Sequence, residues 1–213
     1  MEIRRTANAG TALTLDDVKI LLDGVSREVY PYLATPPEIA KELQPNVLLF
    51  THNHPDHFDP VAAQKLGKPI YGPMQVAEQV SCPVHPDESL TVGSVRITAV
   101  PTRHMGHYGK TTQHQSYVLE GSQTVWFLGD ASPMELKRFA SFSKPDVLIV
   151  PYPYISTPAS MKMVQALLPC KIILLHMPLR DADPEKIWES AAEGIEHLKA
   201  HLYVPQMGEI LNL

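Results

Sequence analysis

The residues best suited to chemistry in this sequence are concentrated between positions 51 and 59. They directly follow the apolar run 47–50, which we expect to be a short buried strand. Imidazole and carboxylate groups at the end of a strand are good ligands for Zn²⁺ or a similar first-row metal. The candidate ligands in this stretch are His52, His54, Asp56 and His57. A metal site explains so compact a set better than a chance cluster of polar loop residues.

The spacing within this stretch supports the same interpretation. His52 and His54 are two positions apart, so that in an extended loop both imidazoles can point the same way. Pro55 favours an extended conformation for His54, because its ring disfavours helical geometry in the preceding residue. Asp56 and His57 follow where the chain turns, and they can face a second metal.

Four more polar residues lie where an expected strand ends. Taken singly, each is more often a turn or surface residue. The ends of strands gathered at one edge of a sheet are, however, where sites of this kind assemble. Together with the first cluster, these residues supply the remaining donors for two metal sites: Asp23 after strand 18–22, His104 after strand 95–100, Asp130 after strand 124–128 and His176 after strand 171–175.

This ordered set of residues resembles the motifs of the metallo-β-lactamase superfamily, over roughly residues 3–213. H-x-H-x-D-H is the most specific part of the likeness. The form Thr-His-Asn-His-Pro-Asp-His-Phe-Asp at 51–59 is similar to the branch of ascorbate-6-phosphate lactonase and N-acyl-phosphatidylethanolamine phospholipase D. That branch also lacks the Gly-Gly that often follows the motif. The resemblance implies an α+β fold, a four-layer αββα sandwich of two mixed β-sheets flanked by helices, with metals at one edge.

The resemblance also implies roles for these residues. Two divalent metal ions are expected, with His52, His54 and His104 at the first and Asp56, His57 and His176 at the second, while Asp130 bridges them. Asp56 and Asp130 are the candidates for a catalytic role, and a bridging hydroxide is the implied nucleophile. The chemistry is sound, because paired metals activate water and stabilise developing charge. Zn is expected, although such donors also accept Mn, Fe or Ni.

Other residues near these positions have several explanations. Asp23 is expected to orient a ligand, and Asp59 either does the same or caps the helix 60–66. His104 is the preferred third ligand of the first metal because it lies nearest the strand end. His107 is the other candidate, and His114 either lines the pocket or faces solvent. His85, His197 and His201 have no expected role.

The loop 103–115 is a candidate substrate-recognition segment. We expect Arg103, His107 and Lys110 to contribute to binding of an anionic substrate. Charges in a solvated loop are an equally good explanation. The stiff aromatic stretch 151–154 is a second candidate for the rim of the site.

Bulk properties narrow the class of protein. The chain has 213 residues, 44% hydrophobic and 19% charged, with a net charge of −5. This suits one domain over residues 1–213 and argues against nucleic-acid binding, which depends on clustered Lys and Arg. No signal peptide and no run of about 20 apolar residues is recognisable, so a cytoplasmic protein is expected. Cys82 and Cys170 are expected to be free buried thiols.

The expected elements alternate between strands and short helices. Apolar runs and turn residues predict strands at 3–6, 11–15, 18–22, 47–50, 69–71, 89–92, 95–100, 116–119, 124–128, 146–150, 171–175, 202–204 and 209–211. Proline at the first turn and apolar periodicity predict helices at 36–43, 60–66, 74–80, from 157, and from 183.

The function that follows is metal-dependent hydrolysis of a small-molecule substrate. A lactone or another ester is the first choice, and a phosphodiester the next. Two alternatives stay open: a mononuclear iron oxygenase on the same fold, and a non-catalytic metal-binding scaffold. The sequence does not reveal the oligomeric state or the substrate.

Overall fold

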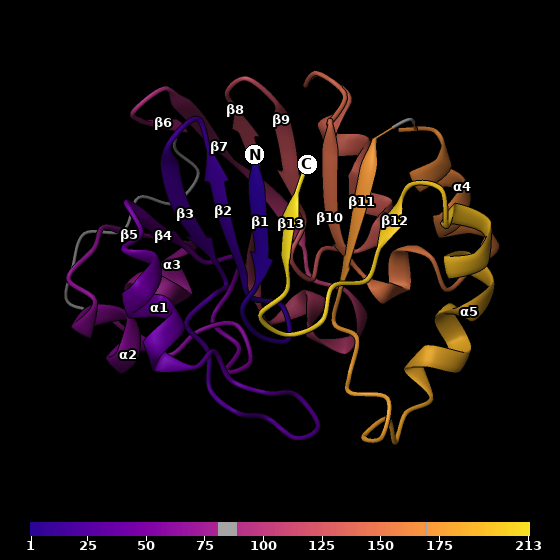
Figure 1. Cartoon of the computed structure of the whole chain (residues 1–213), viewed down its shortest axis with the longest axis horizontal. Coiled ribbons are helices and arrows are strands. Elements are labelled where there is room, and N and C mark those ends of the chain that lie inside the picture. Colours follow the sequence, from indigo (N-terminus) through magenta and orange to yellow (C-terminus); the bar gives the residue numbers. More distant parts are fainter. Residues whose placement is uncertain (81–88, 169) are drawn as a thin grey trace.

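Two mixed β-sheets pack face to face between two groups of helices in the computed structural model of this chain (Figure 1). The structure describes residues 1–80, 89–168 and 170–213. Cys82 and His85, both singled out from the sequence, lie outside the described residues.

The first sheet combines antiparallel and parallel strands. Its order is β13 (Ile210–Asn212), β1 (Glu2–Arg5), β2 (Thr11–Leu15), β3 (Val18–Leu22), β4 (Val47–Leu49) and β5 (Ile70–Tyr71). The strands from β13 to β3 are antiparallel neighbours, whereas β3, β4 and β5 run parallel. The pairing of β1 with β13 brings the two termini side by side (Figure 1).

The second sheet has the same mixed character. Its order is β12 (Leu202–Tyr203), β11 (Lys171–Leu175), β10 (Val147–Pro151), β9 (Thr124–Phe127), β8 (Gln113–Glu120), β7 (Val95–Arg103) and β6 (Ser89–Val92). From β6 to β9 the strands are antiparallel, and from β9 to β12 they are parallel. As a result β7, β9 and β11 point the same way and end at one edge.

Alternating side chains hold the layers together. In β10, Val147 and Ile149 belong to the apolar layer between the sheets, whereas Leu148 and Val150 pack under the outer helices. A strand buried on both faces must be apolar at every position, which is why β10 and β11 read as continuous apolar runs. The same alternation in β4 directs Leu49 inward and Leu48 outward.

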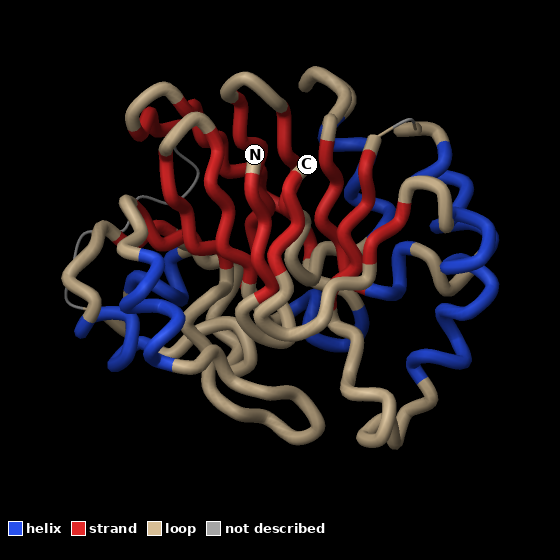
Figure 2. The backbone as a smooth tube through the Cα atoms, viewed as in Figure 1, coloured by secondary structure: helices blue, strands red, loops and turns tan. Residues whose placement is uncertain are grey.

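Helices cover the outer face of each sheet. The first sheet carries α1 (Pro37–Leu43), α2 (Pro60–Lys65) and α3 (Met74–Ala77), and the second carries α4 (Pro158–Gln165), α5 (Ile187–Leu198) and the 3₁₀ segment η2 (Pro133–Phe139). Figure 2 shows the helices on either side of the central strands. The predicted four-layer αββα sandwich is therefore confirmed.

Several element boundaries differ from the sequence-based expectation, among them those of α5, β7 and β8. α5 begins at Ile187 rather than at 183, but the Asp183 carboxylate still accepts hydrogen bonds from the amides of Ile187 and Trp188, at 2.8 and 2.9 Å. β7 extends to Arg103 and β8 begins at Gln113, because the two strands stay paired beyond the expected turn. The expected loop is therefore shortened to a connection that contains the 3₁₀ segment η1 (Gly106–Lys110).

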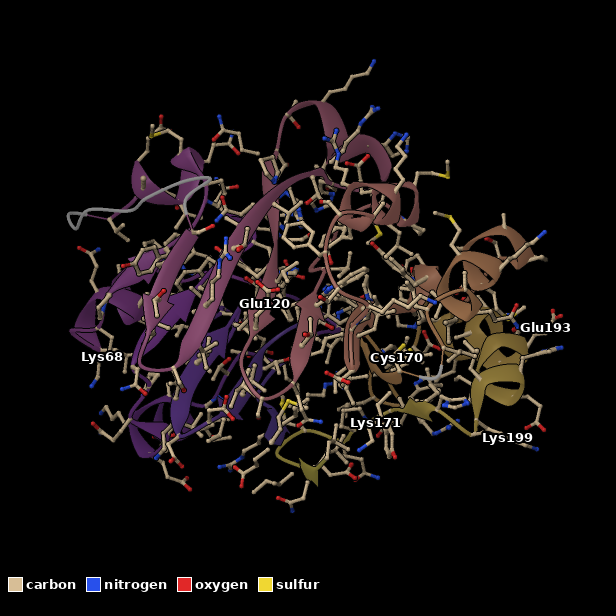
Figure 3. The ribbon with its side chains drawn as sticks, turned by 90° about the horizontal axis from the view of Figure 1, so that it is seen from above. Lys68, Glu120, Cys170, Lys171, Glu193 and Lys199 are labelled. Atoms are coloured by element: carbon tan, nitrogen blue, oxygen red, sulfur yellow. The ribbon has the colours of Figure 1, made fainter. Side chains whose placement is uncertain are left out.

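Cys170 lies directly before β11 and is a free, buried thiol, as expected. Burial raises its pKa to about 11, so that the unreactive protonated form dominates at neutral pH. Figure 3, seen from above, shows Cys170 and Lys171 at the start of β11, with Glu193 on α5 and Lys199 directly after the helix. Within the described part of the chain, every helix is too short or too polar to cross a bilayer.

The contact of α5 with the chain at Ile155 generates a test of the packing. A Cβ atom at Gly194 would overlap the carbonyl oxygen of Ile155 and lie 2.8 Å from its Cβ atom. Gly194→Ala is therefore expected to lower the free energy of unfolding by about 1–3 kcal/mol, despite the better helix propensity of alanine. Chemical denaturation measures the change. The exposed neighbour variant Glu193→Ala is the control and should be nearly neutral.

Candidate metal centre

The candidate ligands converge because the strands that precede them end at one edge of the two packed sheets. β3 and β4 run parallel and lead to Asp23 and to the stretch 51–57. In the other sheet, β7, β9 and β11 lead to His104, Asp130 and His176. The loops at this edge gather in the lower part of Figures 1 and 2.

Three groups of three donors form at this edge within the part of the chain that the structure describes. The group of Asp23, His52 and His57 shares its two histidines with the other two groups, which we call the first and second triads. The ligand atoms of each triad lie within 4.8 Å of one another. The first consists of His52, His54 and His104, and the second of Asp56, His57 and His176. These are the two sets that the resemblance implied, so the structure brings all six predicted side chains together.

Asp130 lies between the two triads. Its Oδ2 atom is 3.5 Å from Nε2 of His104 and 3.4 Å from Nε2 of His57. Its Oδ1 atom is 3.0 Å from Nε2 of His176. One carboxylate therefore contacts a histidine of the first triad and two of the second, which is the position that a bridging ligand requires.

Unpartnered nitrogen atoms show that a metal fits the first triad. Nε2 of His52 and Nε2 of His104 are buried, and neither makes a hydrogen bond within the described residues. Their other nitrogens are held, since Nδ1 of His52 lies 2.9 Å from Oγ1 of Thr51 and Nδ1 of His104 lies 2.7 Å from the carbonyl oxygen of Met105. A buried nitrogen without a partner is costly, and a metal bond would satisfy it.

A buried carboxylate behind the cluster orients two of these histidines. Oδ1 of Asp23 accepts a hydrogen bond from the amide of Thr51, and Oδ2 accepts one from the Thr51 hydroxyl at 2.6 Å. Nδ1 of His57 lies 2.9 Å from the same Oδ2 atom. Asp23 therefore directs Nε2 of His57 into the site and steadies Thr51, which contacts His52. This agrees with the orienting role expected for Asp23.

Asn8 takes part in the second triad although no feature of the sequence pointed to it. Its Nδ2 atom lies 3.2 Å from Oδ2 of Asp56 and 3.0 Å from Nδ1 of His176. Its carbonyl oxygen also accepts a hydrogen bond from the amide of His176. Asn8 thus fixes the orientation of His176, which has a positive φ of 58°. A single asparagine after a strand carries no recognisable signal.

His114 is buried and supports Asp130, rather than facing solvent. The amide of Asp130 donates to Nε2 of His114 at 3.0 Å, so Nδ1 carries the proton and donates to the Thr102 hydroxyl at 2.8 Å. The Thr102 hydroxyl pairs with that of Ser116, which donates to the carbonyl oxygen of Leu128. Both ring nitrogens of His114 are occupied, so it is not a metal ligand in this geometry.

The electrostatic environment keeps His52, His54 and Asp130 in the forms that bind metal, and His57 is the exception. Burial lowers the pKa of His52 and of His54, so both are neutral at pH 7. Burial raises the pKa of Asp130, but His176 and His57 outweigh it and hold that pKa well below its usual value. For His57, burial is opposed by Asp130, Asp56 and Asp23, and its pKa lies well above the usual value. Binding of a metal at His57 therefore requires release of a proton.

A cavity of about 510 Å³ opens above the two triads. We call it the reaction cavity. Besides His54, Asp56, His104, Asp130 and His176, its walls include Val29, Tyr32, Pro55, Met105, Tyr108, Pro151, Tyr152 and Pro153. Residues 151–153 of the expected rim 151–154 therefore line the site, whereas Tyr154 is buried in the core.

The predicted substrate-binding residues have a different placement. Arg103, His107 and Lys110 are exposed, and none of them is among the residues that line the reaction cavity. Their role in recognising an anionic substrate stays a prediction. Tyr108, between them, does line the cavity. Asp59 caps α2, accepting hydrogen bonds from the amides of Val61 and Ala62.

Comparison with known proteins places this geometry in context. Residues 19–205 match a family model described as a beta-lactamase superfamily domain. A UPF0173 metal-dependent hydrolase from Pyrobaculum islandicum is 27% identical over 96% of this chain and 97% of its own length. Among solved structures, a possible metal-dependent hydrolase from Veillonella parvula is similar with a TM-score of 0.79 at 18% identity, covering 100% of this chain and 99% of its own.

The fold also occurs with other chemistry. CmlA, a diiron beta-hydroxylase from Streptomyces venezuelae, is similar with a TM-score of 0.71 at 16% identity, over 100% of this chain and 54% of its own. At this level of identity, the similarity shows the fold alone.

The hydrogen bonds to Asp23 predict the effect of its amide variant. In Asp23→Asn the side chain offers one acceptor where three donors now converge, so a buried donor loses its partner. We expect the affinity for added Zn²⁺ to fall by about 10–100-fold, measured by competition with a chelator. The control is Asp59→Asn, the same change at a helix cap that asparagine also fills well, and it should bind Zn²⁺ normally. Equal affinity in both variants would contradict an orienting role for Asp23.

His114 generates a prediction about pH. Burial lowers its pKa from 6.5 to about 3. Between these values the unfolded chain binds a proton at this position that the folded chain excludes. The contribution of His114 to the free energy of unfolding is therefore at its maximum above pH 6.5. It decreases by up to about 1.4 kcal/mol per pH unit as the pH falls toward 3. Denaturant unfolding of the metal-free protein at several pH values should show a weaker acid dependence in His114→Gln than in the unchanged chain. Parallel curves would refute the assignment.

Proposed function

We infer that this chain, which belongs to the beta-lactamase superfamily, is a metal-dependent hydrolase. Beyond this, we propose that it holds two divalent ions and hydrolyses a lactone or another ester. Phosphodiester cleavage is the second choice. The observation that carries the proposal is the position of Asp130, which contacts His104 of one triad and His57 and His176 of the other.

The donor set supports this count of metals. Each triad would supply three protein ligands to one ion, and Asp130 would be shared between the two ions. Water or substrate would then bind as a further ligand, because catalytic zinc sites can expand to five ligands. Nitrogen and carboxylate donors favour Zn²⁺, and they also accept Mn, Fe or Ni. In this proposal His52, His54 and His104 hold one ion, and Asp56, His57 and His176 hold the other.

Two such ions, when bound, supply an activated water and offset the negative charge that develops on a reacting carbonyl or phosphoryl group. The protein supplies orientation. Asp23 and Asn8 hold the rings of His57 and His176, and Asp130 is held as a carboxylate by its neighbouring histidines. Asp56 and Asp130 are the carboxylates in direct contact with the reacting region. Tyr32, Tyr108 and Tyr152 form aromatic walls of the reaction cavity.

Substrate recognition from the mouth of the cavity is a separate part of the proposal. Arg103, His107 and Lys110 are exposed on the connection between β7 and β8. They would act on a charged group that extends out of the cavity. The substrate is expected to be a small molecule rather than a nucleic acid, because the chain is acidic overall, with a net charge of −5. A cytoplasmic location also stays a prediction.

Two other functions are compatible with the fold and are separable by experiment. A mononuclear iron oxygenase would use only part of the two triads and would contain about one Fe per chain. A non-catalytic scaffold would bind metal without turnover. The presence of both triads favours the hydrolase over the mononuclear oxygenase, whereas turnover separates the hydrolase from the scaffold.

The proposal predicts a specific metal content and its loss. Protein purified without added metal should contain about two Zn or Mn ions per chain by elemental analysis. His54→Ala should lower this content and reduce kcat/KM on a responsive lactone or ester by more than about 100-fold, because it removes a ligand rather than a supporting hydrogen bond. The exposed His197→Ala variant is the matched control and should keep both metal and activity.

Two outcomes would contradict the proposal. One Fe per chain with oxygen-dependent turnover would support the oxygenase. Two bound metals with no turnover on a panel of lactones, esters, thioesters and phosphodiesters would support the scaffold.

A further inference from the structure

A second cavity lies directly beside the metal centre. Its volume is about 560 Å³, within the range of small-molecule sites. We call it the side cavity. It is formed by the segment 31–33, the segment 177–181 after β11, one face of α5 and the segment 204–207. These segments surround Arg5 and Asn8.

Two residues connect the side cavity to the metal centre. Tyr32 lines both the side cavity and the reaction cavity, and its ring stands edge-on to His176 with centroids 6.0 Å apart. Asn8 lines the side cavity and contacts both Asp56 and His176. If the reactive group of a substrate lies at the second triad, Tyr32 and Asn8 lie between that group and the side cavity.

The walls of the side cavity are mainly apolar. Ten of its sixteen lining residues are aliphatic, proline, methionine or tryptophan side chains: Pro31, Leu33, Met177, Pro178, Leu179, Trp188, Ile195, Val204, Pro205 and Met207. Leu33 and Leu179 are 40% and 49% exposed, so apolar surface is left facing the opening. Burial of such surface by a ligand is favourable.

The cationic side chains of the side cavity are already engaged. Arg5 donates to the carbonyl oxygens of Ala7, Pro205 and Met177 at 3.0, 3.0 and 2.7 Å, and burial lowers its pKa to about 10. It therefore ties together two walls of the cavity. The Arg180 guanidinium lies 3.8 Å from the centre of the Trp188 ring. Trp188 in turn donates to the carbonyl oxygen of Pro178, which keeps this wall in place.

We propose that the side cavity receives an apolar acyl or aryl group of the substrate, while the ester or lactone carbonyl lies in the reaction cavity. This deepens the proposed function, on which it depends, and names the substrate class as esters or lactones with a medium-length apolar chain.

Chain-length dependence tests the proposal. For the metal-loaded protein and p-nitrophenyl esters from acetyl to decanoyl, kcat/KM should rise about fourfold per methylene until the cavity is filled, the equivalent of about 0.8 kcal/mol for each buried CH₂. Leu33→Asp and Leu179→Asp place a charge on the apolar wall at partly exposed positions, where folding should be little affected. Both should lower kcat/KM for the octanoyl ester by about tenfold or more, and for the acetyl ester by less than about twofold.

The control substitution is Met74→Asp. Met74 is 49% exposed on α3 and lines neither the reaction cavity nor the side cavity. It should leave the whole chain-length profile unchanged. Two results would overturn the proposal while leaving the hydrolase function intact. One is a kcat/KM of the wild-type protein that does not change with chain length. The other is an equal loss of kcat/KM on short and long esters in the Leu33 and Leu179 variants.

A binding measurement decides the proposal independently of activity. Trp188 lines the side cavity, whereas Trp126 is buried in the core. Decanoate should therefore change the tryptophan fluorescence of the metal-loaded protein saturably, acetate should not, and Trp188→Phe should abolish the decanoate response. If no ester is hydrolysed, the proposed function fails, and this titration alone supports or overturns the apolar site.

Subunit contact is the competing use of the same surface. Sedimentation velocity should show the same oligomeric state for the unchanged chain and for Leu33→Asp. Dissociation of an oligomer by this variant, with an unchanged chain-length profile, would show that the side cavity is a subunit contact and would overturn the proposal.

Discussion

The position of one carboxylate constrains the rest of this structure. Asp130 lies between two triads that together hold five histidines, and its charge is what allows so many imidazoles to lie close together. A lone buried charge would be costly, and a cluster of protonated imidazoles would repel itself. The balance of charge is completed by the carboxylates of Asp23 and Asp56 and by the neutral imidazoles of His52 and His54. Bound metal cations would be further partners for the carboxylates.

Hydrogen bonds and a glycine also fix the backbone around Asp130. Its amide donates to His114, its carbonyl oxygen accepts from the amide of Met105, and the preceding Gly129 has a positive φ of 52°. A side chain at Gly129 would press on Thr51, the residue that links Asp23 to His52. The close approach of β9 and the loop after β4 thus requires glycine at this position. Ligands on rigid strand ends lose little entropy when a metal binds.

Sites on this fold differ in their substrates because of their loops rather than their sheets. The same sandwich is shared with a possible metal-dependent hydrolase and with a diiron beta-hydroxylase, so the fold alone does not choose the reaction. In this chain the segment around Tyr32 and the segment 177–181 form a mainly apolar cavity beside the metal centre, whereas Tyr108 and Tyr152 border the reaction cavity itself. The proposed substrate class therefore rests on the shape and polarity of these loops.

The sequence by itself determined the sandwich and the composition of both triads. H-x-H-x-D-H is local, and an expected strand followed by a polar residue marks each later ligand. This ordered set was therefore recognisable by its resemblance to a known superfamily, which implied the sandwich and the two ligand sets. Only the tertiary structure decided the supporting contacts. Asn8 meets His176 across 168 positions, and His114 meets Asp130 through the pairing of β7, β8 and β9. Such contacts depend on sheet order, register and packing, which bring distant residues together without leaving a pattern along the chain. The apolar side cavity has the same origin, because its walls come from segments that are adjacent only once both sheets have packed.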